Sequence, residues 1–161
     1  MTFPERTLSQ VELEALAIEI ATGDAWRPLL TWSPTQRGYA RVAGNDHVEV
    51  WVLGWMHEHD TGYHDHDVSS GGVAVVEGEL VEERLRIGGD PIRTIFRGGD
   101  SFSFDHTHVH RMHNETHERA ISIHAYSPVV ARLGCYVIEP DGMLRRETQA
   151  WSDELRPLTP A

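Results

Sequence analysis

The first regular pattern along the chain is helical. Apolar residues recur at three- and four-residue spacing in a run that holds Val11, Leu13, Leu16, Ala17 and Ile20. Ser9 followed by Glu12 forms a capping-type pattern, which marks the start of a helix, and Gly23 stops the run. The spacing predicts one amphipathic helix over residues 9–22, inside an N-terminal helical segment of about 9–32.

From Gly38 onward the pattern changes to short β-rich segments separated by Gly, Asp and Asn. Such a succession, without helices between the strands, predicts an all-β sandwich or barrel rather than βαβ units. Tight turns are expected at residues 44–46, 88–91 and 98–100, because Gly, Asn and Asp tolerate the backbone that a reversal needs. The expected strands are residues 38–43, 47–55, 72–77, 79–86, 93–97, 101–104, 108–113, 119–126, 134–138 and 143–147.

Length and composition narrow the class of protein. A chain of 161 residues without repeats or linkers predicts a single domain over 1–161, with a barrel over about 38–148 and a polar tail from Thr148 that wraps the surface or helps an assembly. The net charge of −11 opposes binding to nucleic acid or to anionic membranes. No signal peptide or membrane-spanning run is evident, and Cys135 is the single cysteine, so we expect a cytoplasmic monomer or small homo-oligomer with Cys135 buried as a small apolar residue.

Histidine carries the candidate chemistry, because ten of the eleven histidines fall between His57 and His124. In a strand, residues i and i+2 share a face, so His64 and His66 can bind one ion together, and His110 can supply a third imidazole. Three neutral nitrogen ligands leave a divalent metal its full charge and open positions for an anionic substrate and a small gas molecule. The same period leaves His108 open as an alternative to His110.

These segments resemble the two motifs of the cupins, whose fold is a double-stranded β-helix (jelly-roll) barrel. His64, His66 and Gly78 match the first motif, and Gly99, His110 and Asn114 match the second. Ser70 and Gly71 stand where the first motif places its acidic ligand, so the resemblance implies an all-β cupin barrel with three histidine ligands and no carboxylate. The departures in the second motif are Asp105 and Thr107, which replace its usual Pro and Gly.

Within the cupins, residues 39–138 resemble the cysteine dioxygenase family of thiol dioxygenases. The similarity lies in His64-Asp65-His66, in His110-Arg111 and in the stretch 122–128, Ser-Ile-His-Ala-Tyr-Ser-Pro. The family implies an Fe(II) cofactor, a small thiol and O2 as substrates, and a sulfinic acid as product, with both oxygen atoms passed to sulfur. Activation of O2 would await a substrate thiolate at the metal.

The family also implies roles for the remaining candidate residues. Ser122, His124 and Tyr126 alternate along one expected strand and can form a relay: Tyr126 would bond substrate or oxygen, His124 would orient it, and Ser122 would anchor His124. Arg41 matches the arginine that binds the carboxylate in cysteine-specific members, since a guanidinium fork suits a carboxylate. Gly71 replaces the cysteine that mammalian-type members link to the tyrosine, which predicts a freer tyrosine and a wider pocket that admits larger thiols.

Other interpretations stay open at this point. His64 and His66 could be solvent-facing turn residues, Tyr126 a core aromatic, and Arg41 a surface ion-pair partner. L-Cysteine is the leading substrate because of Arg41, with 3-mercaptopropionate or an ergothioneine-like thiol as alternatives. Rival functions are a non-catalytic metal-binding cupin, and a cupin isomerase or acireductone-type enzyme, which the missing carboxylate ligand disfavours.

Overall fold

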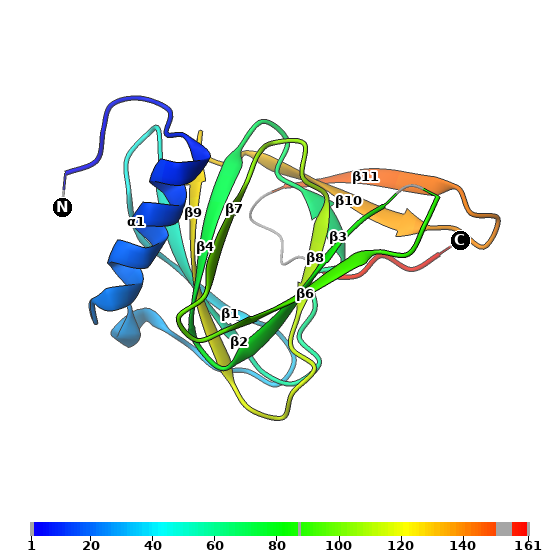
Figure 1. Ribbon diagram of the computed structural model, residues 1–161, viewed down its shortest axis with the longest axis horizontal. Coiled ribbons are helices and arrows are strands. Elements are labelled where there is room, and N and C mark those ends of the chain that lie inside the picture. Colours follow the sequence, from blue (N-terminus) through cyan, green and yellow to red (C-terminus); the bar gives the residue numbers. More distant parts are fainter. Residues whose placement is uncertain (1, 87, 151–155, 161) are drawn as a thin grey trace.

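The computed structural model describes residues 2–86, 88–150 and 156–160, and over these ranges one α-helix, one short 3-10 helix and two β-sheets make up the fold (Figure 1). The helices are α1 (Gln10–Thr22) and η1 (Arg27–Leu29). The strands are β1 (Gly38–Gly44), β2 (Glu49–Trp55), β3 (Tyr63–Asp65), β4 (Ser70–Glu77), β5 (Glu79–Arg84), β6 (Ile92–Arg97), β7 (Ser101–Phe104), β8 (His110–His113), β9 (Ala120–Ser127), β10 (Arg132–Ile138) and β11 (Leu144–Ala150).

The N-terminal helix begins one residue later than its pattern predicts, because Ser9 is the cap rather than the first helical residue. The Ser9 side chain accepts from the Glu12 backbone, and the Glu12 carboxylate accepts from the Ser9 N–H at 2.8 Å. Leu13 and Ala17 are buried against the five-stranded sheet, which the helix covers on its outer face (Figure 1). The predicted helix is therefore confirmed.

Two antiparallel sheets form the barrel, which confirms the all-β cupin fold. One sheet has the order β1-β2-β9-β4-β7, and the other has the order β11-β10-β3-β8-β5-β6. Ten of the strands correspond to the expected segments, β7 with the same ends and the other nine with shifted ends. β3 was not among them, because three residues are too few to give a strand pattern, although His64 and its neighbours were expected to be extended.

Alternation along the five-stranded sheet divides its side chains between two cores. Val50, Val52 and Ile123 face α1, while Trp55, Val73 and Tyr126 face the barrel interior. Cys135 packs in the interior core with 2% exposure, and burial raises the pKa of its thiol to about 11, as expected for a small apolar residue.

The end of the chain packs on the barrel. β11 continues to Ala150, so residues 148–150 of the predicted tail form the end of an edge strand, and residues 151–155 and 161 of that tail lie outside the described residues. Further on, Leu158 packs against the interior core, and Pro157 lies so close to Gly62 that an added Cβ there would be 2.6 Å from the Pro157 Cα. Over the described ranges, neither helix has the length and apolar character needed to cross a membrane.

Candidate functional site

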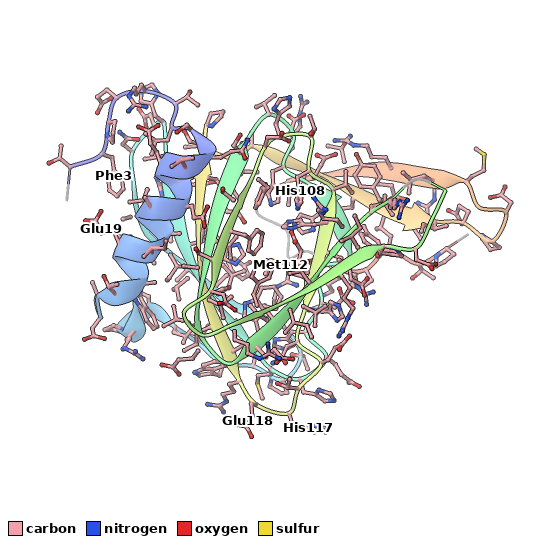
Figure 2. The ribbon with its side chains drawn as sticks, in the orientation of Figure 1. Phe3, Glu19, His108, Met112, His117 and Glu118 are labelled. Carbon is pink, nitrogen blue, oxygen red and sulfur yellow. The ribbon has the colours of Figure 1, made fainter. Side chains whose placement is uncertain are left out.

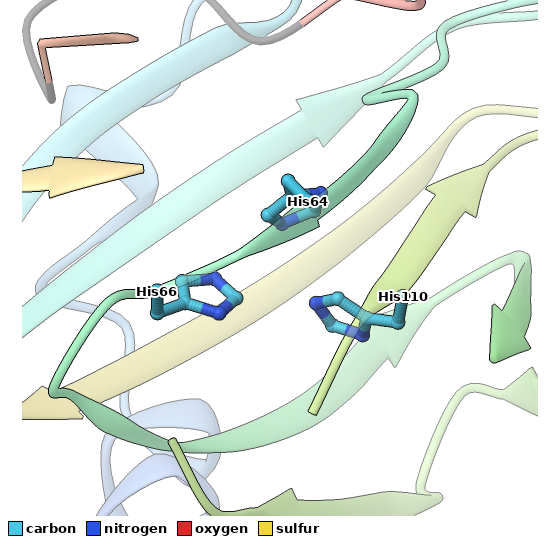
Figure 3. Close-up of side chains that lie close together, drawn as sticks. All are labelled: His64, His66 and His110. Carbon is cyan, nitrogen blue, oxygen red and sulfur yellow. The ribbon is translucent and has the colours of Figure 1, made fainter. Parts of the chain in front are cut away.

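Three histidines from two neighbouring strands meet inside the barrel. His64 lies on β3, opposite His110 on the antiparallel β8, and His66 follows directly after β3. One ligand nitrogen from each ring lies within 4.8 Å of the others, and Figure 3 shows the three rings turned toward a common space. The side chains are buried, with exposures of 3%, 2% and 1% for His64, His66 and His110. The sequence-predicted trio is thus brought together, and solvent-facing turn positions are excluded for it.

The protonation state of the trio suits a metal. Burial is the main cause that lowers the pKa of all three imidazoles, so their ring nitrogens keep a lone pair at neutral pH. Nδ1 of His64 lies 3.0 Å from the Gly62 carbonyl oxygen, which accepts only from a protonated nitrogen and so leaves Nε2 as the lone-pair atom. His66 Nδ1 is buried and has no hydrogen-bond partner among the described residues. Neutral and convergent imidazole nitrogens, one of them without a hydrogen-bond partner, fit a divalent transition metal.

A carboxylate that sequence reasoning missed lies behind this trio. Glu82 of β5 is 5% exposed, and its Oε1 lies 2.9 Å from His110 Nδ1 and 2.7 Å from His108 Nε2. Burial pushes the pKa of Glu82 upward, but the hydrogen bonds with His108 and His110 outweigh it and lower the pKa to about 2. His110 lies in a group with His64 and His66 that could hold a metal ion, and it also lies in a second such group with Glu82 and His108.

A chain of hydrogen bonds runs along β9 to the phenol of Tyr126. Trp55 Nε1 donates to Ser122 Oγ at 2.9 Å, Ser122 Oγ lies 2.8 Å from His124 Nε2, and His124 Nδ1 lies 3.1 Å from Tyr126 Oη. Because the indole N–H can only donate, the simplest proton order has the serine donating to Nε2 and Nδ1–H donating to the phenol oxygen. The phenol proton is then directed elsewhere.

Burial determines the charge of this relay. It lowers the pKa of His124 to about 3 and, together with the charge of Glu49, raises the pKa of Tyr126 well above its ordinary value. His124 is therefore neutral and Tyr126 is a phenol that can donate. The sequence predicted the three β9 residues through their period of two. Trp55 of β2 fits a residue that fills the barrel, but its hydrogen bond to Ser122 was not predicted.

The relay and the histidine trio share one space. The ring centroids of His66 and Tyr126 are 5.0 Å apart, and the Phe104 ring lies 4.9 Å from both His66 and His110. The Tyr126 ring is therefore adjacent to His66, one of the candidate metal ligands, and its catalytic role stays a prediction.

The expected extra room at Gly71 is absent, which corrects the wider pocket inferred from sequence. A Cβ added to Gly71 would lie 2.2 Å from Cζ of Phe104. Gly71 pairs with Phe104 across β4 and β7, and the ring fills the volume that the missing side chain leaves. A larger side chain on the neighbouring strand compensates for the glycine, so Gly71 gives no support for larger thiols.

Two arginines differ in their access to this space. Arg41 of β1 is exposed, and its guanidinium donates to the Asn45 carbonyl at 3.2 Å, at the rim of the sheet. Arg37 was not among the predicted residues, yet it is 6% exposed and its guanidinium lies 5.2 Å from the Trp55 ring centroid. After burial and His110, its charge is a further cause that lowers the pKa of His124. A role for Arg41 stays a prediction.

Three other histidines, His57, His59 and His117, make contacts outside the trio. His57 and His117 pair with ring centroids 4.1 Å apart, and Figure 2 shows His117 at the end of the barrel farther from His108. His59 Nδ1 accepts from the Met56 N–H at 3.0 Å. These contacts hold loops and offer no ligand to the trio.

The fold and the buried trio define a cupin with a candidate metal centre, and comparison with known proteins then assigns a family. Residues 8–139 match the family described as cysteine dioxygenase type I, and the chain belongs to that family. It is therefore placed among the cupin dioxygenases that depend on a metal.

Similarity to solved structures concerns the fold alone. An uncharacterized conserved protein with a double-stranded β-helix domain from Klebsiella pneumoniae subsp. pneumoniae is 17% identical, with a TM-score of 0.56 over 74% of this chain and 91% of that one. KdgF from Halomonas sp. is 17% identical, with a TM-score of 0.52 over 62% and 86%. An oxalate oxidase solved with the substrate analogue glycolate is 15% identical, with a TM-score of 0.53 over 63% and 55%.

Proposed function

We propose that the protein is an Fe(II)-dependent thiol dioxygenase that converts a small thiol, R–SH, and O2 to the sulfinic acid R–SO2H, with L-cysteine as the leading substrate. The observation that carries the proposal is the 5.0 Å separation of the His66 and Tyr126 ring centroids, which puts a buried phenol beside one of three neutral imidazoles. His64, His66 and His110 would hold the ferrous ion, which when bound supplies the redox chemistry between sulfur and oxygen.

The chain's own residues would control protons and water at this site. Tyr126 would donate a hydrogen bond to substrate or oxygen, because His124 already supplies the proton of the bond between them. Ser122 and Trp55 hold His124 in that tautomer and add no charge. Phe104, packed on the rings of His66 and His110, keeps water from this side of the site.

A small, carboxylate-bearing substrate agrees with the space and the charges. The Phe104 ring restricts the volume beside Tyr126, which disfavours a bulky ergothioneine-like thiol. Arg41 stands at the position where the resemblance implies a carboxylate-binding arginine, and Arg37 is a buried cation nearer the relay. Either guanidinium would bind the carboxylate of cysteine or of 3-mercaptopropionate.

Oxygen uptake by the iron-loaded protein with a panel of thiols tests the function. We expect uptake with one O2 consumed per thiol and a product heavier by two oxygen atoms, and a Tyr126→Phe variant that keeps iron should turn over more slowly. A non-catalytic cupin would consume no oxygen above background with any thiol, and that result would refute the proposal.

Cysteine and cysteamine, which lacks the carboxylate, separate the two arginines. If Arg41 binds the carboxylate, Arg41→Ala should raise the KM for cysteine by the equivalent of about 2–4 kcal/mol and leave the KM for cysteamine unchanged. Arg37→Ala should show that selectivity instead if Arg37 binds it. Equal effects on both thiols would assign the arginine a structural role.

A further inference from the structure

A negative charge lies next to the candidate metal ligands although none of the ligands carries one. Glu82 and Leu80 alternate on the inward face of β5, and Glu82 pairs with Met112 of β8. This register places the Glu82 carboxylate beside His110, two residues from Met112 along β8, so that one oxygen accepts from both His110 and His108. The arrangement needs two strands and is not visible in the order of residues along the chain.

Burial of this carboxylate has a cost that its partners offset. A charged group that is 5% exposed loses its hydration, and ring N–H donors at 2.7 and 2.9 Å replace part of it. The bond from His110 Nδ1 fixes the ring's orientation and leaves Nε2 as its lone-pair atom. His108, at 16% side-chain exposure, forms the second bond from the other side.

We propose that Glu82 is the positioning residue for the third metal ligand: it orients His110, and its charge strengthens the His110 ring as a donor and stabilises the oxidised state of a bound iron. His108 fixes the carboxylate in that position and binds no metal. The inference rests on the proposed metal site, but it does not require that the substrate be a thiol. In this arrangement Glu82 supplies a negative charge next to the site, because the three neutral imidazole ligands carry none.

The test measures iron binding and the reduction potential of the bound iron, without any thiol substrate. Dissociation constants for Fe(II), determined anaerobically by chelator competition, and reduction potentials of the iron-loaded proteins would be compared for wild type, Glu82→Gln and Glu83→Gln. Glutamine keeps the size and an acceptor oxygen but removes the charge. Glu83 is the matched control, because it lies on the same strand and faces away, toward the Tyr63 hydroxyl at 2.8 Å and Arg111.

We expect Glu82→Gln to weaken Fe(II) binding by about 10- to 100-fold and to raise the reduction potential, while Glu83→Gln changes neither. A Glu82→Asp variant, which restores the charge, should recover part of both. Thermal unfolding of the apo proteins identifies a variant that fails to fold. If Glu82→Gln fails to fold, Glu82→Asp is compared with wild type instead. Unchanged affinity and potential in Glu82→Gln would overturn the proposal.

Two further results would discriminate between explanations. If His108→Ala abolishes iron binding and His64→Ala does not, the metal lies in the neighbouring group of Glu82, His108 and His110, and the proposal is wrong. If the Glu82 variants change iron binding as expected but the wild-type protein oxidises no thiol, the proposed function fails and the role of Glu82 stands.

Discussion

Replacement of Gly71 by alanine should destabilise the protein through Phe104. The new Cβ would lie 2.2 Å from Cζ of that ring, which is too close for two non-bonded carbon atoms, so the ring must move. Overpacking of this kind costs about 1–3 kcal/mol, while the lower chain entropy of alanine in the unfolded state returns about 0.4–1 kcal/mol. We expect a net loss of about 1–2 kcal/mol in the free energy of unfolding.

The structure also predicts how this loss depends on the ring. Phe104→Ala should cost about 3–5 kcal/mol by opening a cavity. In that background Gly71→Ala should be neutral or stabilising by up to about 1 kcal/mol, which gives a coupling energy of about 1–3 kcal/mol between the two positions. Because Phe104 packs 4.9 Å from His66, the single Gly71 variant should also weaken iron retention.

Urea denaturation of the four apo proteins measures the cycle. Gly89→Ala is the control, because its Cβ would meet nothing closer than 3.4 Å, and we expect a change within about 0.5 kcal/mol. Equal costs of Gly71→Ala with and without the Phe104 ring would refute the argument that the ring fills the glycine's space.

Three other predictions concern the site. Each of the variants His64→Ala, His66→Ala and His110→Ala should lose bound iron on anaerobic gel filtration, and full retention by any one would remove that residue from the ligand set. Ser122→Ala should retain iron but lower kcat, because the proton order that directs the Tyr126 hydroxyl is lost; unchanged kinetics would exclude the relay. The pKa of His124 is lowered to about 3 in the folded state, so below about pH 6.5 the unfolded state binds more protons than the folded state. Through this group, the free energy of unfolding of the apo protein should fall by up to about 1.4 kcal/mol per pH unit as the pH drops from 6.5 toward 3. Urea titrations at several pH values should show a flatter pH dependence for a His124→Gln variant.

Local patterns predicted much of the fold. The helix follows from its capping box and apolar spacing, and most strands follow from β-rich segments between turns. β3 is the exception: it is held by pairing with β8 and β10 rather than by its own preference. Strand ends also shifted by one to three residues at most strands, because pairing with neighbours decides where a strand stops.

For the candidate site, the sequence by itself determined which residues of one strand share a face. It puts His64 with His66, and Ser122 with His124 and Tyr126, because alternate residues of one strand share a face. Only the tertiary structure decided which groups from other strands join them: Glu82 behind His110, Trp55 beside Ser122, and Phe104 in the space at Gly71. Those contacts depend on strand register and packing between residues distant along the chain, and local residue preferences do not specify either.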